Sequence, residues 1–433
     1  MNATWLGNGK LGVSLALLLA ALLLAASSWF YIQHILIPRQ IVEAAAHDHP
    51  RGNLSDLYPR WLGARELLLH HRDPYSAEVT REIQAGYYGR VLDPARSGDP
   101  RDQQAFAYPA YVVFLLAPTI LLPFGIVQTV FYWALWLIMG ASLLLWLRVQ
   151  RWRPKNFTIA SLMVLTLGSI PVIQAIKLQQ LTVVVAGLLA ACGLLLVSRH
   201  FISAGVVLAF STIKPQLAWP LVAWLVLWAL SDWRKRAGLM WGFGSTMAIL
   251  LAGAECVLPG WTGRFLSGIA AYEKYTDATS ILAELTTRAI GAGLALAIVA
   301  VTAGVCWRLR RQSQDSAAFA WILATLLAVT VVVSPTASTY NQILLLPGGL
   351  LLGRNADTFM KKEGFTGFAC MLAAFILFWP WLAALILAGL SLLLPPALVQ
   401  RVWSAPLWSN MMTPVVVLLL LAPLAGTVLH EQR

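Results

Sequence analysis

The chain has 433 residues, of which 59% are hydrophobic and only 12% are charged. Soluble globular proteins carry roughly 25% charged residues, so this composition excludes a soluble protein. The formal net charge of +12 would suit a nucleic-acid partner if the basic residues formed one surface patch.

The charges are distributed differently. Residues 38–106 hold nine Arg and ten acidic residues, whereas the other basic residues lie in short clusters between apolar runs. Such clusters are typical of a multi-pass membrane protein whose positive loops face the cytoplasm. We therefore predict one all-α membrane domain over residues 1–433, embedded in the lipid bilayer and without a nucleic-acid partner.

The apolar runs predict about 11 to 13 membrane-spanning helices, because each crossing needs roughly 20 apolar residues. The first run is longer than the apolar core of a signal peptide and is predicted to be a retained span. The candidate spans are residues 11–36, 107–124, 126–147, 157–176, 181–197, 203–230, 238–258, 289–307, 317–335, 342–353, 365–394 and 407–429.

Two of these regions are interrupted. Lys214-Pro215-Gln216 divides residues 203–230, and because proline breaks helices and a lysine is costly at mid-membrane, we predict a hairpin of two short helices. Residues 107–147 contain two apolar runs around Pro123 but must cross an odd number of times. One of these runs is therefore either re-entrant or interfacial, and the pattern leaves both possibilities open.

The basic clusters predict which loops face the cytoplasm. They are Arg148/Arg151/Arg153/Lys155, Arg199, Arg234/Lys235/Arg236, Arg308/Arg310/Arg311 and Arg354/Lys361/Lys362. The opposite face then carries a large first extracytoplasmic loop, residues 38–106, and a second one, residues 259–288. In the first loop, residues 59–71 predict an amphipathic helix on the membrane surface that roofs a cavity, and Asp73-Pro74-Tyr75 predicts its end.

Asp56 is the candidate catalytic residue. It lies at the entry to the amphipathic helix, where a carboxylate beside an apolar cavity can accept a proton from an attacking hydroxyl group. The alternative is that Asp56 only caps the helix that follows it.

Cations on the non-cytoplasmic face are the candidate binding residues. Lys214 and Lys177 border apolar helices and are predicted to bind a lipid-linked phosphate, unless they extend to the membrane interface. The outer segment 259–288 carries a set of cations and aromatic residues that either binds phosphate and sugar or forms an interfacial belt. This set is Arg264, Lys274, Arg288, Trp261, Tyr272 and Tyr275.

Residues 334–342 form a run of small hydroxyl and amide side chains that includes Tyr340 and Asn341. The run can hydrogen-bond sugar hydroxyls, or it is an ordinary turn with proline. No metal site is predicted, because His47, His49, His70 and His71 lack ligand spacing. The chain also contains no nucleotide-binding loop motif.

Four stretches follow one another in a recognisable order. They are Asp56-Leu57-Tyr58 with Ala64-Arg65 and Asp73-Pro74-Tyr75; Phe106 to Pro109 with Leu116-Ala117-Pro118 and Leu122-Pro123-Phe124; Gln179-Gln180-Leu181-Thr182; and Ile213-Lys214-Pro215-Gln216. Together they resemble the GT-C superfamily of glycosyltransferases. The resemblance is strongest to glycosyltransferase family 87, the polyprenyl-phosphate-mannose-dependent mannosyltransferases.

The resemblance implies a GT-C-like bundle with its catalytic carboxylate at Asp56. It implies a membrane hexosyltransferase that moves mannose, or another hexose or pentose, from a polyprenyl-phosphate donor to a lipid or glycan acceptor with inversion, without a metal or other cofactor. The implied setting is a bacterial-type cytoplasmic membrane, with the active site facing outward. The candidate substrate-binding residues are Tyr58, Arg65, Tyr108, Lys177, Gln180, Lys214, Gln216, Arg264, Tyr340 and Asn341.

Two positions depart from the family pattern. Family members often carry a histidine shortly after Ser-Pro, but after Ser334-Pro335 this chain has Tyr340 and Asn341. The second proline of the family's Tyr-Pro-Pro is Ala110 here. The alternative function is a transporter or flippase of lipid-linked saccharides, which would show paired interrupted helices and ionisable groups at mid-span. The concentration of ionisable residues in the first outer loop favours the enzyme.

Overall fold

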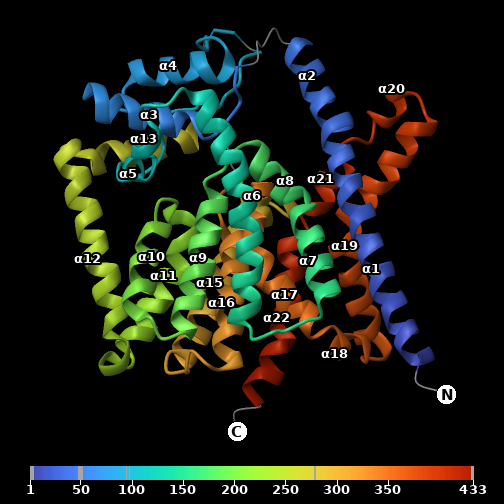
Figure 1. Ribbon diagram of the computed structural model, residues 1–433. Helices are drawn as coiled ribbons and strands as arrows, with labels where there is room; N and C mark the ends of the chain where they lie inside the picture. Colours follow the sequence, from blue (N-terminus) through green and yellow to red (C-terminus); the bar gives the residue numbers. More distant parts are fainter. Residues whose placement is uncertain (1–3, 47–51, 94, 97, 277–278, 431–433) are drawn as a thin grey trace.

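The computed structural model describes residues 4–46, 52–93, 95–96, 98–276 and 279–430, and over these ranges it is helical without strands (Figure 1). The longer helices are α1 (Thr4–Tyr31), α2 (Ile37–Ala46), α3 (Tyr58–His70), α4 (Ala77–Tyr88), α6 (Phe124–Val149), α7 (Asn156–Leu167), α8 (Ile170–Lys177), α9 (Thr182–Val197), α10 (Phe201–Ser211), α11 (Pro215–Leu230), α12 (Trp233–Val257), α13 (Trp261–Thr276), α15 (Arg288–Leu309), α16 (Ala317–Val333), α17 (Leu346–Arg354), α19 (Gly364–Leu393) and α22 (Thr413–His430). The short ones are α5 (Val112–Leu116), α14 (Ile281–Leu285), α18 (Ala356–Met360), α20 (Pro396–Val399) and α21 (Ala405–Asn410), with a π-helix at Ile32–Leu36 and 3₁₀ turns at Ala117–Thr119 and Thr339–Leu345.

Six helical stretches in the described ranges are long and apolar enough to cross a membrane, and a seventh is the bent pair α7–α8. Four further apolar helices, α9, α10, α11 and α16, are shorter. The protein is therefore an all-α multi-pass membrane protein. The prediction of 11 to 13 spans counted these shorter helices as crossings. The six long stretches, the bent pair and all four shorter helices together give eleven.

The first helix is longer than predicted. α1 continues through the π-helix into α2 and ends at Ala46 rather than at residue 36. Pro38 has no N–H group to donate to the preceding turn, and the π-helix Ile32–Leu36 comes just before it in the chain. The helix therefore runs past residue 38 to Ala46, and the start of the first extracytoplasmic loop at residue 38 stays a prediction.

Residues 107–124 are not a span. Only Val112–Leu116 is α-helical, a 3₁₀ turn follows it, and the crossing is made by α6 alone. Pro109, Pro118 and Pro123 divide this apolar run, and none of them can donate the backbone bond that a continuous helix requires. Figure 1 shows α5 at the same end of the molecule as α3 and α13. Residues 107–147 therefore cross once, through α6, which satisfies the odd number of crossings that was required of them.

The predicted span 157–176 is broken. α7 and α8 meet at an angle of 54°, where Gly168 and Ser169 separate them and Pro171 lies in the first turn of α8. A Cβ atom at Gly168 would lie 2.2 Å from the Cβ atom of Ala25. The glycine therefore permits α1 to pack against the break.

The hairpin predicted at residues 203–230 is confirmed. α10 and α11 are joined by Thr212 to Lys214, and the rings of Phe201 and Trp228 at their other ends lie 6.0 Å apart. α10 packs closely on α12, because the Cβ position of Gly205 is occupied by the backbone of Leu239. Lys214 therefore lies at the tip of a short hairpin.

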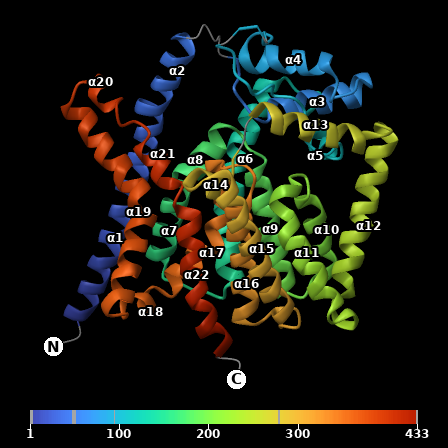
Figure 2. The same ribbon diagram turned by 180° about the vertical axis from the view of Figure 1, so that it is seen from behind.

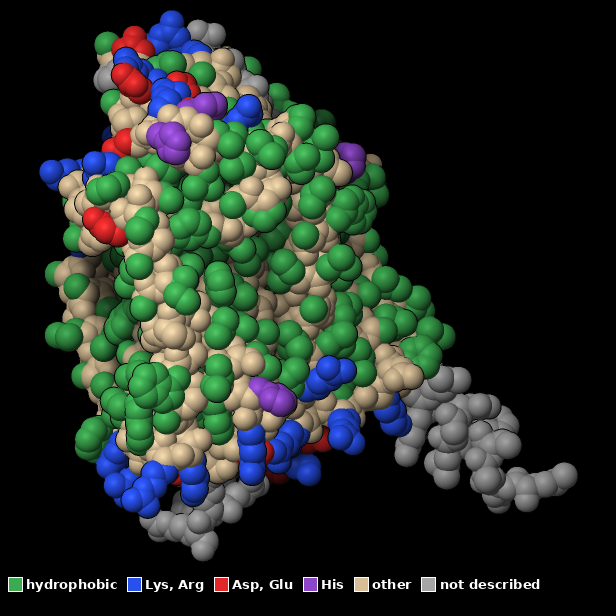
Figure 3. All heavy atoms as spheres, turned by 60° about the vertical axis from the view of Figure 1, so that its left-hand side comes forward, with side chains coloured by type: hydrophobic (Ala, Val, Ile, Leu, Met, Phe, Trp, Pro, Cys, Tyr) green, Lys and Arg blue, Asp and Glu red, His purple; other side chains and the backbone are tan. Residues whose placement is uncertain are grey.

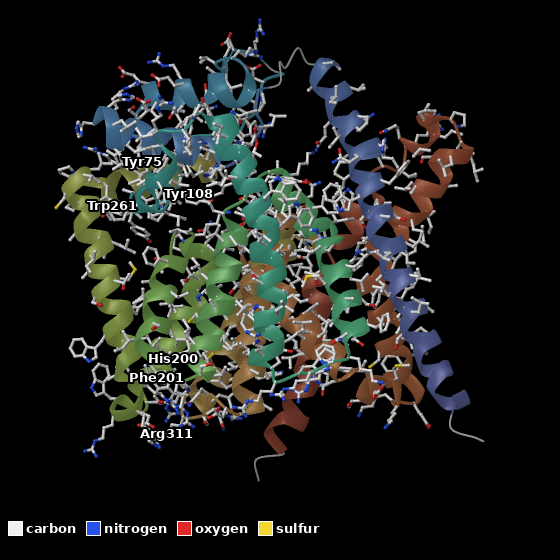
Figure 4. All side chains as sticks on the ribbon, viewed as in Figure 1. Tyr75, Tyr108, His200, Phe201, Trp261 and Arg311 are labelled. Carbon is white, nitrogen blue, oxygen red and sulfur yellow. The ribbon has the colours of Figure 1, made fainter. Side chains whose placement is uncertain are left out.

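The basic clusters gather at one end of the molecule, which we call the basic end. Arg151 and Arg199 both pair with Asp315, Arg199 at 3.0 Å, and Arg354 donates to the Gln150 carbonyl. Figure 3 shows Lys and Arg side chains along this end, below a wide band of hydrophobic side chains. Figure 4 shows His200, Phe201 and Arg311 at this end and Tyr75, Tyr108 and Trp261 at the other.

Arg236 at the basic end should be essential for stability. Its side chain is only 5% exposed and donates to the carbonyls of Trp228, Arg310 and Gln312 at 2.7, 3.1 and 2.9 Å. Arg236→Ala removes these three charge-assisted hydrogen bonds, at a cost of about 3 kcal/mol in total, while Trp228 Nε1 and the Ser231 hydroxyl still donate to the same carbonyls. We expect a melting temperature several degrees lower in detergent. Arg234→Ala, an exposed neighbour, is the control, and an equal effect of both variants would contradict the prediction.

The other end, which we call the capped end, is covered by α3, α4 and α13 (Figures 1 and 2). α3 matches the helix predicted at residues 59–71, and it ends at His71 in a left-handed conformation. The carboxylate of Asp73 then accepts from the amide of Tyr75 at 2.9 Å, which confirms the predicted turn. Residues 259–288, predicted as a loop, contain α13 and α14, so that the second connection is helical.

Candidate active site

The carboxylate of Asp56 faces other side chains rather than the start of α3. Its Oδ1 accepts a hydrogen bond from the Tyr87 hydroxyl at 3.0 Å, and its Oδ2 accepts one from Gln180 Nε2. α3 begins without a side-chain cap. The alternative that Asp56 only caps this helix is therefore excluded by the geometry.

The backbone around Asp56 is fixed by two distant parts of the chain. The amide of Asp56 donates to the Leu178 carbonyl at 2.8 Å, and the Ser55 hydroxyl donates to Gln179 Oε1 at 2.5 Å. On the other side, the amide of Asn53 donates to the Gly86 carbonyl at 3.1 Å. The connection between α2 and α3 is thus held between the α8–α9 junction and the end of α4, which gives Asp56 a defined position.

Gln180 links Asp56 to Lys214. The ammonium group of Lys214 donates to Gln180 Oε1 at 2.8 Å and to the Thr182 hydroxyl at 2.7 Å. An ammonium group can only donate, so it fixes Oε1 toward itself and leaves Nε2 of Gln180 for the carboxylate. The amide of Gln180 therefore has one orientation in which all of these bonds are made.

Aromatic rings surround the two cations nearest to Asp56. The Lys214 ammonium lies 5.8 Å from the ring centre of Tyr108 and 5.3 Å from that of Tyr340. The guanidinium of Arg60 lies 4.4 Å from the ring centre of Tyr108 and donates to the Asp56 carbonyl at 2.5 Å. Asn341 is buried close by, where its Oδ1 accepts from the Thr182 hydroxyl at 3.3 Å.

The environment of Asp56 changes its acidity in two directions. Burial raises the pKa of the carboxyl group above its ordinary value, while the charge of Arg60 and the hydrogen bond from Tyr87 oppose this rise. A buried carboxylate that keeps its charge only with such partners can accept a proton from a neutral hydroxyl group. The arrangement is thus chemically suited to general-base catalysis.

The predicted site residues fall into three groups. Asp56, Tyr108, Gln180, Lys214, Tyr340 and Asn341 are brought together in the cluster described above. Lys177 and Arg264 each line a separate cavity. Tyr58, Arg65 and Gln216 are not brought to Asp56. The ring of Tyr58 packs on Phe124, the guanidinium of Arg65 lies over Trp61, and Gln216 is exposed in the first turn of α11.

The first cavity, which we call the α1–α6 groove, measures about 400 Å³. Trp29, Gln33, Tyr132, Lys177 and Gln179 line it, together with neighbouring residues. Lys177 donates to the Gln40 side chain at 3.1 Å there. Gln179 in its wall accepts a hydrogen bond from the hydroxyl of Ser55, the residue before Asp56.

The second cavity, which we call the α13 pocket, measures about 570 Å³ and lies between α13 and residues 73–75 and 105–106. Arg264 forms an ion pair with Asp73 at its edge, at 3.2 Å. Figure 4 shows Tyr75, Tyr108 and Trp261 near one another at this end, on α13 and the segments beside it. Arg264 is therefore paired in the α13 pocket and does not contact Asp56.

Sequence reasoning missed several contributors to the cluster. Arg60 follows Asp56 by one helical turn, a spacing that could have identified it, and Thr182 belongs to the quoted Gln-Gln-Leu-Thr stretch. Tyr87 carried no local signal, because it lies 31 residues from its partner. Among the described side chains, no group of three or more His, Cys, Asp or Glu could hold a metal ion. His47 and His49 lie outside the described residues.

The fold and the cluster define a multi-pass helical membrane protein with a carboxylate held between cations and amides at one end. The sequence model of glycosyltransferase family 87 matches residues 106–335, more than half of the chain, and the chain belongs to this family. It is therefore a membrane glycosyltransferase. The match includes Tyr108, Gln180 and Lys214, whereas Asp56 precedes it. No curated protein and no solved structure matches the chain. The GT-C-like arrangement of the bundle stays a prediction.

Proposed function

We propose that this protein transfers a sugar from a polyprenyl-phosphate donor to a lipid or glycan acceptor, with inversion at the anomeric carbon and with Asp56 as the general base. The observation that carries the proposal is the position of the Asp56 carboxylate. It is buried and connected through Gln180 to Lys214, at the capped end of a membrane glycosyltransferase. In the proposed orientation the basic end faces the cytoplasm and the capped end faces outward.

The proposed reaction is one displacement. The acceptor hydroxyl loses its proton to the Asp56 carboxylate and forms a bond to the anomeric carbon, while the bond from that carbon to the phosphate oxygen breaks. The electron pair of the broken bond stays on the lipid phosphate. Lys214 and Arg60 flank Asp56 and supply the positive charge that this leaving group needs.

The α1–α6 groove supports a lipid donor. Trp29, Ile32 and Tyr132 provide an apolar and aromatic wall for the prenyl chain, and Lys177, Gln33 and Gln128 add polar groups to the groove. The π-helix at Ile32–Leu36 forms part of this wall, and such interruptions are frequent at functional sites. The proposed donor lies in this groove with its sugar toward Asp56.

The missing histidine after Ser334-Pro335 has a structural counterpart. Tyr340 and Asn341 occupy this region, where the Tyr340 ring faces the Lys214 ammonium and Asn341 accepts from Thr182. We propose that this aromatic and amide pair fulfils the binding role of the absent imidazole. The family match supports transfer rather than transport as the activity of the site.

The proposal is tested by incubating the purified protein with short-chain polyprenyl phosphates that carry mannose, glucose or a pentose, together with a membrane lipid extract. Mass spectrometry should detect a glycosylated acceptor and free polyprenyl phosphate in equal amounts. Movement of intact donor across a proteoliposome membrane, without any glycosylated product from the whole panel, would instead indicate the transporter.

Tyr87→Phe should move the acidic limb of the pH–rate profile to higher pH. The Tyr87 hydroxyl stabilises the charged form of Asp56, so its removal raises the pKa of the base further. Because the general base must be deprotonated to act, the enzyme loses activity as the pH falls through this pKa. The profile of kcat/KM against pH is compared with that of Tyr88→Phe, whose hydroxyl donates to the Asp102 carbonyl instead. A limb that stays in place in Tyr87→Phe would contradict the prediction.

A further inference from the structure

The α13 pocket has no role in the reaction as described so far. One wall consists of small residues of α13, including Gly263, Ser267 and Gly268, and the opposite wall contains Tyr75 and Phe106. The hydroxyl of Tyr275, which also lines the pocket, is buried and has no hydrogen-bond partner among the described residues. A buried hydroxyl without a partner is costly, and a polar ligand in the pocket would supply one.

The pocket adjoins the cluster around Asp56. Tyr75 in its wall donates to the Tyr108 carbonyl at 2.5 Å, and the Tyr108 ring carries the Arg60 guanidinium on its face. From the helix side, burial and then the charge of Asp102 raise the pKa of Tyr275, and burial and then the charge of Asp56 raise the pKa of Asp102. Tyr75 of the pocket is therefore connected to the backbone of Asp56 through Tyr108 and Arg60.

The pocket and the α1–α6 groove lie on different sides of α6. The groove is bordered by α1, α6 and α8 and the pocket by α13, and Figures 1 and 2 both show α13 on the far side of α6 from α1. A displacement with inversion requires the attacking oxygen to enter opposite the leaving phosphate. Two cavities on different sides of α6 can hold the donor and the acceptor separately, which is compatible with this requirement.

The lining favours a carbohydrate. The rings of Tyr75 and Phe106 meet edge to face at 5.2 Å and offer apolar surface to the C–H face of a sugar ring. Sugar hydroxyls both donate and accept, so they can bind the Asp73–Arg264 pair and the Tyr275 hydroxyl together. A bare phosphate would instead meet the Asp73 carboxylate beside Arg264.

We infer that the α13 pocket binds the carbohydrate headgroup of the acceptor and directs one of its hydroxyl groups toward Asp56. This inference rests on the proposed function, because it assigns the second substrate of the same reaction. It makes Tyr75, Tyr275 and the small residues of α13 determinants of acceptor specificity.

The test measures the binding of two separate probes to the protein in lipid nanodiscs. Radiolabelled octyl mannoside, glucoside and galactoside probe the pocket, octyl tetraethylene glycol is the sugar-free control, and farnesyl phosphate probes the groove. Gly268→Leu fills the pocket, since a Cβ atom there has its nearest contact at 3.8 Å. Gly244→Leu is the matched control on α12, where a Cβ atom meets nothing within 4 Å.

We expect saturable binding of at least one octyl glycoside, weakened about tenfold by Gly268→Leu and unchanged by Gly244→Leu. Tyr275→Phe removes only the unpaired hydroxyl and should weaken the same glycoside. Farnesyl phosphate should bind all variants equally, which also shows that they are folded.

The acceptor assignment is overturned if no glycoside binds saturably beyond the sugar-free control, if Gly268→Leu leaves glycoside binding unchanged, or if it weakens farnesyl phosphate instead. Failure of the donor proposal is recognised separately. It would appear as absence of turnover with every polyprenyl-phosphate sugar, whatever the glycosides do.

Discussion

Replacing Asp56 with asparagine should lower the rate of sugar transfer by about 1,000-fold, within the range that general-base catalysis contributes. The fold should stay intact in this variant, because an amide has nearly the shape of a carboxylate and can still accept from Tyr87. The amide cannot, however, take up the proton of the acceptor hydroxyl. The loss should therefore fall on kcat, with a similar KM for the donor.

The control for this variant is Asp93→Asn, which neutralises an exposed carboxylate in the same connection between α2 and α6. Both variants are compared in the mass-spectrometric assay and in farnesyl phosphate binding. If Asp56→Asn keeps the turnover of the unmodified protein while binding farnesyl phosphate normally, Asp56 is not the base, and the buried cluster has another function.

Replacing Lys214 with methionine should lower turnover by about 100-fold, which corresponds to roughly 2.7 kcal/mol in the activation free energy. Two effects combine. The leaving phosphate loses a nearby cation, and Gln180 loses the donor that fixes its amide, so that it no longer presents Nε2 reliably to Asp56. Methionine keeps much of the length of the side chain between the rings of Tyr108 and Tyr340.

The pH profile separates these two effects. The Lys214 charge and the Gln180 hydrogen bond both hold down the pKa of Asp56, so Lys214→Met should move the acidic limb to higher pH as well as lower the maximum rate. Lys235→Met, an exposed lysine at the basic end, should change neither. A lowered maximum with an unmoved limb would mean that Lys214 acts on the phosphate alone.

Hydropathy and charge in the sequence were sufficient to identify the class of protein. Apolar runs and basic clusters identified a multi-pass helical membrane protein, because lipid requires every backbone group to be paired within a helix. The clusters around Arg151, Arg199 and Arg354 do share one end. The break at Lys214-Pro215 could also be predicted from the sequence, because proline interrupts a helix at its own position.

Helix length was less predictable than helix position. The first span was expected to end at residue 36, but the helix continues through a π-helix to Ala46. Residues 157–176 were expected to form one span, but the helix is bent at Gly168, where Ala25 of α1 packs against it. In both cases the outcome depends on packing against other helices, and the sequence of one segment does not reveal these contacts.

The sequence by itself determined that Asp56 and Lys214 are unusual. Asp56 is a carboxylate at the entry to a helix, and Lys214 is a cation beside apolar helices on the non-cytoplasmic face, where cations are disfavoured. Only the tertiary structure decided that they belong to one cluster. Asp56 and Gln180 are 124 residues apart, and Arg264, a plausible partner by sequence, pairs with Asp73 instead. The physical reason is that hydropathy and local breaks act within a segment, whereas hydrogen bonds across a membrane bundle depend on how the helices pack.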